Sequence, residues 1–276
     1  KNKDLSPESV FSDSLTNTIY GHEARYAPMS LNTLKGVNYD RILQIWKERY
    51  ASPGQFVYYF IGNFDEATLR PLIEKYIGCL PKGKAEDWKE TPAYATGKLE
   101  NKFTRKSETP KAIAFEQWFA PMPYTVENDV LTDAAGQVLS MVYLKNIRED
   151  ASAAYSVSAG GLLQRRGDKA YALIQTFCPM DPNKSDLALK LLAEGMKENG
   201  EKMDADKVQK VKDFMLKQAE LSAKSNSHWM DVIDEYVWTG VDFQSGYKAA
   251  VEALTPAKIA AYLKKLVSAG NHAEVV

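Results

Sequence analysis

The residues best suited to chemistry lie in one short stretch, NIREDASAAYSVSAGG, which covers residues 146–161. Arg148 lies near the end of a predicted helix, and Tyr155 follows seven residues later, where a strand of small and polar residues is predicted to begin. Arginine is a fixed cation with a rigid fork of donors, and tyrosine carries a neutral hydroxyl donor on a stiff ring. Two such donors at a helix-to-strand junction could bind a peptide carbonyl or stabilise an oxyanion.

The rest of the sequence offers neither a metal site nor an activated nucleophile for these donors to assist. No H-x-x-E-H motif occurs in either direction, and His22 has no second histidine within helical reach. We expect His228 to be a helix-surface or packing residue and His272 to be exposed at the start of a strand. Neither Cys79, at a helix end, nor Cys178, in an apolar strand, has a candidate base, and a buried inert thiol is expected for Cys178.

Arg148 and Tyr155 each have an ordinary structural interpretation as well. Arg148 could complement the dipole of its helix and pair with Glu149 or Asp150. Tyr155 could be a strand aromatic that fills a gap between layers. The residue types alone favour the structural interpretation of both side chains.

Hydrophobic periodicity predicts both helices and strands along the chain. Helices are predicted at residues 6–20, 38–50, 66–77, 126–148, 185–199, 204–225, 227–239 and 255–267. Strands are predicted at residues 55–62, 98–106, 112–120, 154–159, 170–178 and 272–276. Gly160-Gly161 is expected to form a hairpin turn, and Arg165-Arg166 beside Asp168 a solvated hairpin tip. These elements predict an α+β fold with helices on one face of the sheet.

Two units and a linker are predicted. Residues 80–97 are rich in Pro, Gly, Lys and Glu and show little periodicity, which is typical of a linker. The helix-to-strand plan of residues 38–60 recurs at 255–276, with a shift of 217 residues, although chance could produce this echo. We therefore expect residues 1–81 to be the C-terminal part of an upstream α/β repeat, 82–97 a linker, and 98–276 a complete repeat.

Composition limits the class of protein. With 45% apolar and 26% charged residues, the chain has the composition of a globular protein. A net charge of -1 gives no argument for nucleic acid or an anionic membrane surface, and no apolar run approaches the length of a membrane span. The chain starts at Lys1 without a signal peptide, so we expect it to be part of a longer parent. The compartment stays unknown, with the periplasm or cell envelope expected if the parent carries a signal peptide.

Residues 38–81 resemble the end of a repeat in the insulinase (pitrilysin) family of zinc metallopeptidases, which includes mitochondrial processing peptidase. The similarity covers the helix, the strand ending Gly62-Asn63-Phe64-Asp65, the next helix and the closing Leu80-Pro81. Residues 98–276 resemble the following repeat. Arg148 and Tyr155 have the spacing of an Arg/Tyr pair in the family's non-catalytic C-terminal half. Residues 201–229 are similar to its long helix followed by Asn-Ser-x-Trp.

The resemblance implies a two-part clamshell, in which each half consists of two α/β repeats around a closed chamber. It implies a mostly antiparallel sheet in each repeat, and a zinc ion in the first half only, on an inverted H-x-x-E-H helix with a distal Glu. In active members the arginine holds a substrate carbonyl, and the tyrosine hydroxyl faces the reaction intermediate.

The sequence therefore predicts the non-catalytic C-terminal region, or inactive peptidase domain, of an insulinase-like zinc metalloendopeptidase. Such a region would close the chamber, bind an extended peptide by strand addition, and offer Arg148 and Tyr155 to the scissile carbonyl. We expect no catalytic residue and no metal in the isolated chain, and zinc in the N-terminal half of the parent. That catalytic half and an extended peptide are the expected partners. A homodimer of this chain could cover the surface that the catalytic half occupies in the parent. An inert scaffold or assembly subunit, or an independent peptide-binding module, remains an alternative.

Overall fold

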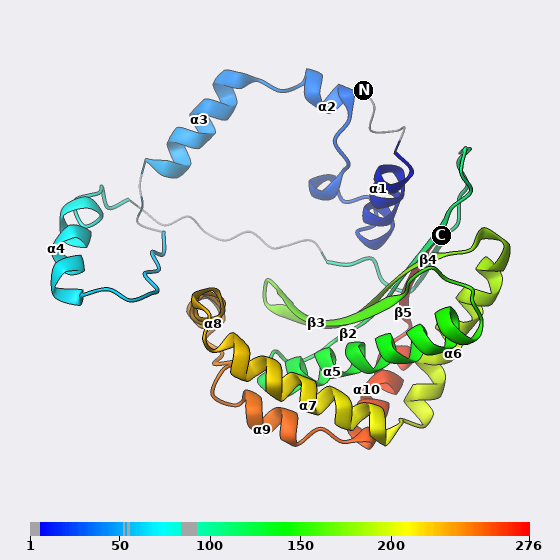
Figure 1. The fold of residues 1–276 in the computed structure, drawn as a ribbon. Helices are drawn as coiled ribbons and strands as arrows, with labels where there is room; N and C mark the ends of the chain where they lie inside the picture. The colour runs from blue at the N-terminus through cyan, green and yellow to red at the C-terminus, as the bar shows by residue number, and fades with distance from the viewer. Residues whose placement is uncertain (1–5, 52, 54–55, 84–92, 107) are drawn as a thin grey trace.

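One twisted sheet with helices on both sides forms the centre of the molecule (Figure 1). The computed structural model describes residues 6–51, 53, 56–83, 93–106 and 108–276. Most of the helices between residues 126 and 268 lie on one side of the sheet, and the helix Pro7–Ile19 lies on the other (Figure 1). The predicted α+β class is confirmed, and most of the helices do cover one face.

The sheet contains five strands in the order β1-β5-β2-β4-β3. The strands are β1 (Lys98–Asn101), β2 (Ala112–Pro121), β3 (Ser158–Arg166), β4 (Lys169–Met180) and β5 (Asn271–Val275). The β1–β5 pair is parallel and the other pairs are antiparallel. The mostly antiparallel sheet expected from the resemblance is therefore present, with β3 and β1 at its two edges.

Most predicted helices are present with boundaries close to those expected. The α-helices are α1 (Pro7–Ile19), α2 (Leu31–Lys35), α3 (Tyr39–Tyr50), α4 (Glu66–Tyr76), α5 (Val126–Tyr143), α6 (Ser185–Glu201), α7 (Ala205–Ser222), α8 (Asn226–Thr239), α9 (Tyr247–Glu252) and α10 (Pro256–Ser268). The short α2 and α9 were not predicted. Polar side chains begin the two helices of the proposed echo: the Arg41 amide donates to Asn38 Oδ1, and the Lys258 amide to Thr255 Oγ1.

The main hydrophobic core lies between the sheet and the layer formed by α5, α6, α7, α9 and α10. Val138 and Leu139 of α5, Ile174 of β4 and Leu263 of α10 are fully buried there. Alternate residues of each strand face this layer, as the period of two in a strand requires. The core therefore fixes the register of the sheet and the position of α5, which leads into the candidate site.

The predicted turn at Gly160-Gly161 is wrong, because both glycines lie inside β3. A Cβ atom on Gly161 would lie 1.8 Å from the Thr132 carbonyl oxygen of α5. Glycine is therefore required here for a close approach between helix and strand backbones. The chain reverses instead at Gly167, whose φ of 62° is left-handed. The strand predicted at 154–159 begins only at Ser158, and Ala154 forms an isolated bridge with Met180.

The strand predicted at residues 55–62 is also wrong. Residues 56–62 form no strand, and Gln55 lies outside the described residues. A strand is stable only beside a partner, and no described strand pairs with this segment. Helices α2, α3 and α4 around it contain no buried residue. The strand predicted at 98–106 ends at Asn101, and most of the predicted linker lies outside the described residues.

Candidate functional site

Helix α5 continues into a π-helical segment, η4 (Leu144–Asp150), and Arg148 lies on this segment. A π-helix is rare, and short π-helical stretches occur frequently at functional sites. Ile147 is fully buried, whereas Arg148 is exposed. The segment therefore anchors the end of α5 through Ile147 and leaves the neighbouring guanidinium in solvent.

The turn from residue 151 to residue 155 is held by hydrogen bonds on both sides. The Ala153 amide donates to the Ile147 carbonyl at 2.8 Å, and the Tyr155 amide donates to the Pro179 carbonyl of β4 at 2.9 Å. The Lys184 ammonium donates to the carbonyls of Ala151 and Ser152, each at 3.1 Å. These bonds connect the backbones that carry Arg148 and Tyr155 to the end of β4.

Both donor groups predicted from the sequence are exposed. The Tyr155 side chain is 65% exposed. Among the described residues, neither the Arg148 guanidinium nor the Tyr155 hydroxyl has a hydrogen-bond or ion-pair partner, and the two do not bond each other. Asp150, suggested as an ion-pair partner of Arg148, pairs with Lys145 at 2.6 Å. The structure therefore places the two donors on either side of one hydrogen-bonded turn, with both polar groups accessible.

Strand β3 follows this turn and forms a free edge of the sheet. On the face opposite α5, Leu162 is 46% exposed and Phe177 of β4 is 43% exposed. Between them, Gly160 is opposite Gln175, whose amide donates to Gln117 Oε1 at 2.8 Å. This open face beside Tyr155 is therefore apolar and neutral polar in character.

The edge strand was the part of this site that the sequence analysis missed. Its signal was present, because the residues Gly167-Asp168 between two extended runs are a recognised hairpin sequence. The sequence predicts a hairpin tip at Arg165-Arg166 beside Asp168, and the chain does reverse next to it, between β3 and β4. The additional turn predicted at Gly160-Gly161 divides this strand, so the continuous edge from Ser158 to Arg166 was not predicted.

The expectation that His272 is exposed is wrong. Its side chain is buried and stacks on Trp118 with a ring-centroid distance of 3.9 Å. His228 is on helix α8 and contacts Gln244 Oε1 at 3.0 Å, as a helix-surface residue could. Cys178 is buried, and burial raises the pKa of its thiol to about 11, which is consistent with an inert thiol.

The predicted solvated tip at Arg165-Arg166 is correct for Arg165 and wrong for Arg166, which is only 5% exposed. The Arg166 guanidinium lies 4.3 Å from the centre of the Tyr94 ring and donates to Tyr26 Oη at 2.7 Å. It also donates to Tyr20 Oη at 3.3 Å. Cation–π contacts and hydrogen bonds therefore attach the segment after α1 to the β3–β4 hairpin.

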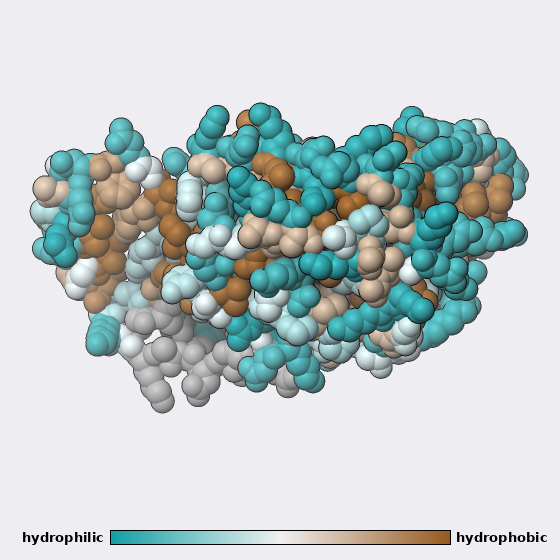
Figure 2. Space-filling model, turned by 90° about the horizontal axis from the view of Figure 1, so that it is seen from below, coloured by the Kyte–Doolittle hydropathy of each residue, from teal (hydrophilic) through white to brown (hydrophobic). Residues whose placement is uncertain are grey.

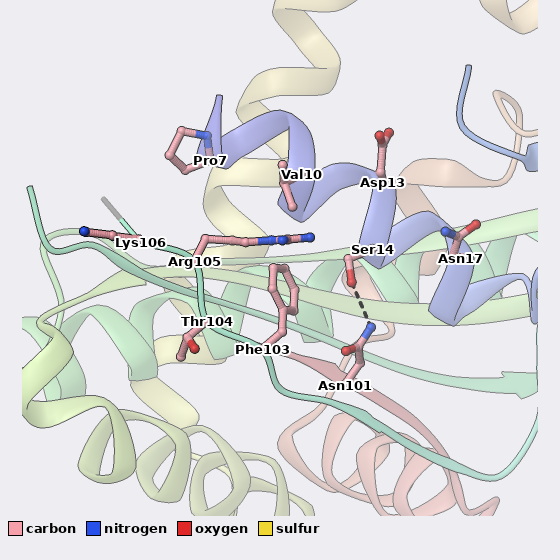
Figure 3. A pocket seen from close by; sticks show the side chains of 10 residues that line it. All are labelled: Pro7, Val10, Asp13, Ser14, Asn17, Asn101, Phe103, Thr104, Arg105 and Lys106. Atoms are coloured by element: carbon pink, nitrogen blue, oxygen red, sulfur yellow. Dashed lines mark hydrogen bonds between the residues drawn. The ribbon is translucent and has the colours of Figure 1, made fainter. Parts of the chain in front are cut away.

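A cavity of about 700 Å³ lies between α1 and residues 101–106 (Figure 3). At its floor Asn101 donates to Ser14 Oγ at 2.8 Å, and it also donates to Thr18 Oγ1 at 2.8 Å. Figure 3 shows Arg105 extending along the cavity toward α1. Neither Arg148 nor Tyr155 lines it. The cavity is a feature of the α1–sheet contact and lies outside the candidate site.

The described part of the chain contains no group of three or more His, Cys, Asp or Glu side chains that could hold a metal ion. The described helices likewise include none that is long and apolar enough to cross a membrane.

Comparison with known proteins identifies the family. A model described as "Peptidase M16 inactive domain" matches residues 36–215, which is more than half of the chain. The chain belongs to this family. The resemblance inferred from the sequence, to a non-catalytic region of the zinc metallopeptidases, is thereby confirmed.

Three similar proteins illustrate the relationship. The chain is 22% identical over 252 residues to a PQQL-like zinc protease of Arabidopsis thaliana, covering 84% of this chain and 26% of that protein. It is 29% identical over 158 residues to the uncharacterized zinc protease YmxG of Bacillus subtilis, covering 55% and 37%. The fold matches the periplasmic protease PqqL of Escherichia coli with a TM-score of 0.79 at 18% identity, covering 100% of this chain and 31% of that one.

The chain covers between 26% and 37% of the length of those three relatives. Two of them are named zinc proteases. The described residues of this chain do not fit a zinc ion, because no suitable ligand group occurs among them. The scaffold and independent-module alternatives gain no support from these relatives.

Proposed function

We propose that this chain is the non-catalytic wall of a peptide-binding chamber in a longer zinc protease, the parent. The observation that carries the proposal is the turn at residues 151–155. It is hydrogen-bonded to η4 and β4, and it presents two accessible donors, Arg148 and Tyr155, at the start of a free sheet edge. A fixed backbone with accessible donors is what positioning of a substrate carbonyl requires.

The two donors take different roles in this proposal. The Arg148 guanidinium binds a carbonyl of the bound peptide, because its planar fork can hold an oxygen in a defined direction. The Tyr155 hydroxyl donates to the oxygen of the scissile carbonyl as negative charge develops there. Metal chemistry would come from the N-terminal half of the parent, since the described residues of this chain include no group that could hold the ion.

The edge strand β3 is the proposed site of contact with the rest of the peptide. A free edge exposes unpaired backbone donors and acceptors, so an extended peptide can add to the sheet as a further strand. The adjoining open face carries Leu162, Phe177 and Gln175 and no charged side chain between them. These contacts favour an extended segment with uncharged side chains next to the cleaved bond.

The exposed apolar surface of α3 and α4 supports the proposal that a preceding part of the same polypeptide packs against it. Trp46 is 56% exposed, Tyr76 is 63% exposed, and Phe60 between the two helices is 41% exposed. Figure 2 shows hydrophobic side chains gathered at the end of the molecule that carries α4. Burying one large apolar side chain contributes about 1.5–3 kcal/mol. We propose that residues 1–81 complete an upstream repeat, and that 82–97 link it to the repeat formed by 98–276.

The role of Arg148 is tested by Arg148→Ala in the parent. We expect kcat/KM for a peptide to fall by about ten- to a hundred-fold, because one charged hydrogen bond to the substrate contributes about 1.5–3 kcal/mol. Lys145→Ala is the matched control, since Lys145 is another exposed cation of η4 that pairs with Asp150. Steady-state kinetics of both variants provide the measurement. Equal effects of the two substitutions would contradict the proposed contact.

A further inference from the structure

A group of polar side chains is buried between the sheet and the helices, apart from the candidate site. Glu116 in the central strand β2 is 1% exposed, and His272 in β5 is 8% exposed. The His272 ring stacks on Trp118, with 18° between the ring planes. His272 Nε2 lies 3.9 Å from Glu116 Oε1. The carboxyl and the imidazole therefore face each other in the interior.

Several polar atoms of this group have no hydrogen-bond partner among the described residues. They are both carboxyl oxygens of Glu116, Nε2 of His272 and Nε1 of Trp118. An ionised carboxylate without partners is very costly in the interior, and so is an unpaired imidazolium. The arrangement therefore favours a protonated, neutral carboxyl beside a neutral imidazole.

The surrounding charges also disfavour ionisation of Glu116. Glu274 is directly opposite Glu116 across the β2–β5 pair, and like charges at that position repel. Lys102 binds Glu274 at 2.8 Å and so is already paired. The Tyr143 hydroxyl near Glu116 donates to the Leu192 carbonyl. The titratable groups that act on the pair from neighbouring elements are Lys98 and Glu100 of β1, Lys102, Glu274 of β5, Tyr143 of α5 and Cys178 of β4.

We propose that Glu116 and His272 form a proton-binding pair in the core, and that loss of the Glu116 proton destabilises the centre of the sheet at alkaline pH. The pair is a conformational device independent of the peptide-binding role, because it lies inside the sheet and helix layers. Strand β2 pairs with both β4 and β5. A charge on Glu116 would therefore act on the strand that joins the two parts of the sheet.

The two groups have opposite effects on the pH dependence of stability. Burial raises the pKa of Glu116 from 4.5 to about 8. Its contribution to the free energy of unfolding is therefore complete below pH 4.5 and is lost as the pH rises to about 8. Burial lowers the pKa of His272 from 6.5 to about 4. Its contribution to the free energy of unfolding is therefore complete above pH 6.5 and is lost as the pH falls to about 4. Between pH 4.5 and pH 6.5 the effects of the two groups on the free energy of unfolding oppose each other. Between pH 6.5 and pH 8 only the loss of stability from Glu116 remains.

The test compares urea unfolding of the full chain and Glu116→Gln from pH 5 to pH 9. Glutamine keeps the shape but cannot ionise. We expect the unfolding equilibrium constant of the unmodified chain, divided by that of the variant, to rise about tenfold per pH unit up to about pH 8 and then level off. The control is Glu220→Gln, because the Glu220 side chain is 74% exposed. A ratio independent of pH, or the same trend with the control, would overturn the proposal.

A second measurement on the unmodified chain keeps the proposal testable if Glu116→Gln fails to fold. Carbon-13 NMR of the Glu116 carboxyl and nitrogen-15 NMR of the imidazoles report the two protonation states directly. The chain has only three histidines, which simplifies assignment. We expect a protonated Glu116 and a neutral His272 at pH 7. A carboxyl that titrates near 4.5, or an imidazolium at pH 7, would refute the neutral pair.

Discussion

Tyr155→Phe in the parent is expected to lower kcat for peptide cleavage by about ten- to a thousand-fold, the range for loss of one donor to a developing oxyanion. The substitution removes only the hydroxyl. The backbone of residue 155 stays bonded to the Pro179 carbonyl, so the position of the ring should not change. KM should change much less than kcat, because the donor acts mainly in the transition state.

The matched control for this experiment is Tyr236→Phe. Tyr236 lies on α8 and is 57% exposed, similar to Tyr155, but it is outside the candidate site. Steady-state kinetics and thermal unfolding of both variants separate a catalytic effect from a loss of fold. A kcat for Tyr155→Phe equal to that of the control would exclude the proposed role of the hydroxyl.

Gly161→Ala is expected to reduce the free energy of unfolding by about 3 kcal/mol or more, at the upper end of the range for overpacking. The added methyl group would lie 1.8 Å from the Thr132 carbonyl oxygen and 2.4 Å from its carbonyl carbon. These atoms belong to the backbone of α5, so no side-chain rotation can relieve the contact. Helix α5 or strand β3 would have to move.

The neighbouring glycine is a close control for this prediction. A Cβ atom on Gly160 would meet nothing within 4 Å, so Gly160→Ala should change stability by less than about 0.5 kcal/mol. Urea unfolding at one pH compares the two variants. Equally small effects of the two substitutions on the free energy of unfolding would contradict the close backbone contact between β3 and α5. Such a result would favour a hairpin turn at this glycine pair.

Local sequence signals predicted most of the elements of this fold. Helices with clear periodicity and a polar first residue, such as those after Asn38 and Thr255, were correctly placed. The strand at Ala112–Pro121 was also correct to within one residue. The failures arose where tertiary contacts determine the role of a residue. Gly161 serves a helix–strand contact with Thr132, and no local pattern distinguishes that use from a turn.

The positions of charged and aromatic residues depended even more on long-range contacts. Arg166 is buried because Tyr20, Tyr26 and Tyr94 surround it, and these side chains come from distant parts of the sequence. His272 is buried because β5 pairs with β2 and brings the ring onto Trp118. The sequence could indicate these residue types but not their surroundings.

The candidate site was predictable only in part for the same reason. The spacing of Arg148 and Tyr155 indicated two donors at a helix-to-strand junction. The π-helical end of α5 and the bonds to the Ile147 and Pro179 carbonyls became apparent only in the structure. These contacts hold the donors in place, and they support the proposal that the residues face a substrate.

Photocrosslinking in the parent tests most directly whether this chain forms a wall that contacts the substrate. The photoreactive amino acid p-benzoylphenylalanine would replace Tyr155 in one variant and Phe214 in another. Phe214 is 52% exposed on α7, which packs on the side of α5 away from the proposed chamber. We predict crosslinking of a peptide substrate at position 155, reduced by excess unlabelled peptide, and none at position 214. Absence of a specific crosslink at 155, or equal crosslinking at both positions, would contradict the proposal.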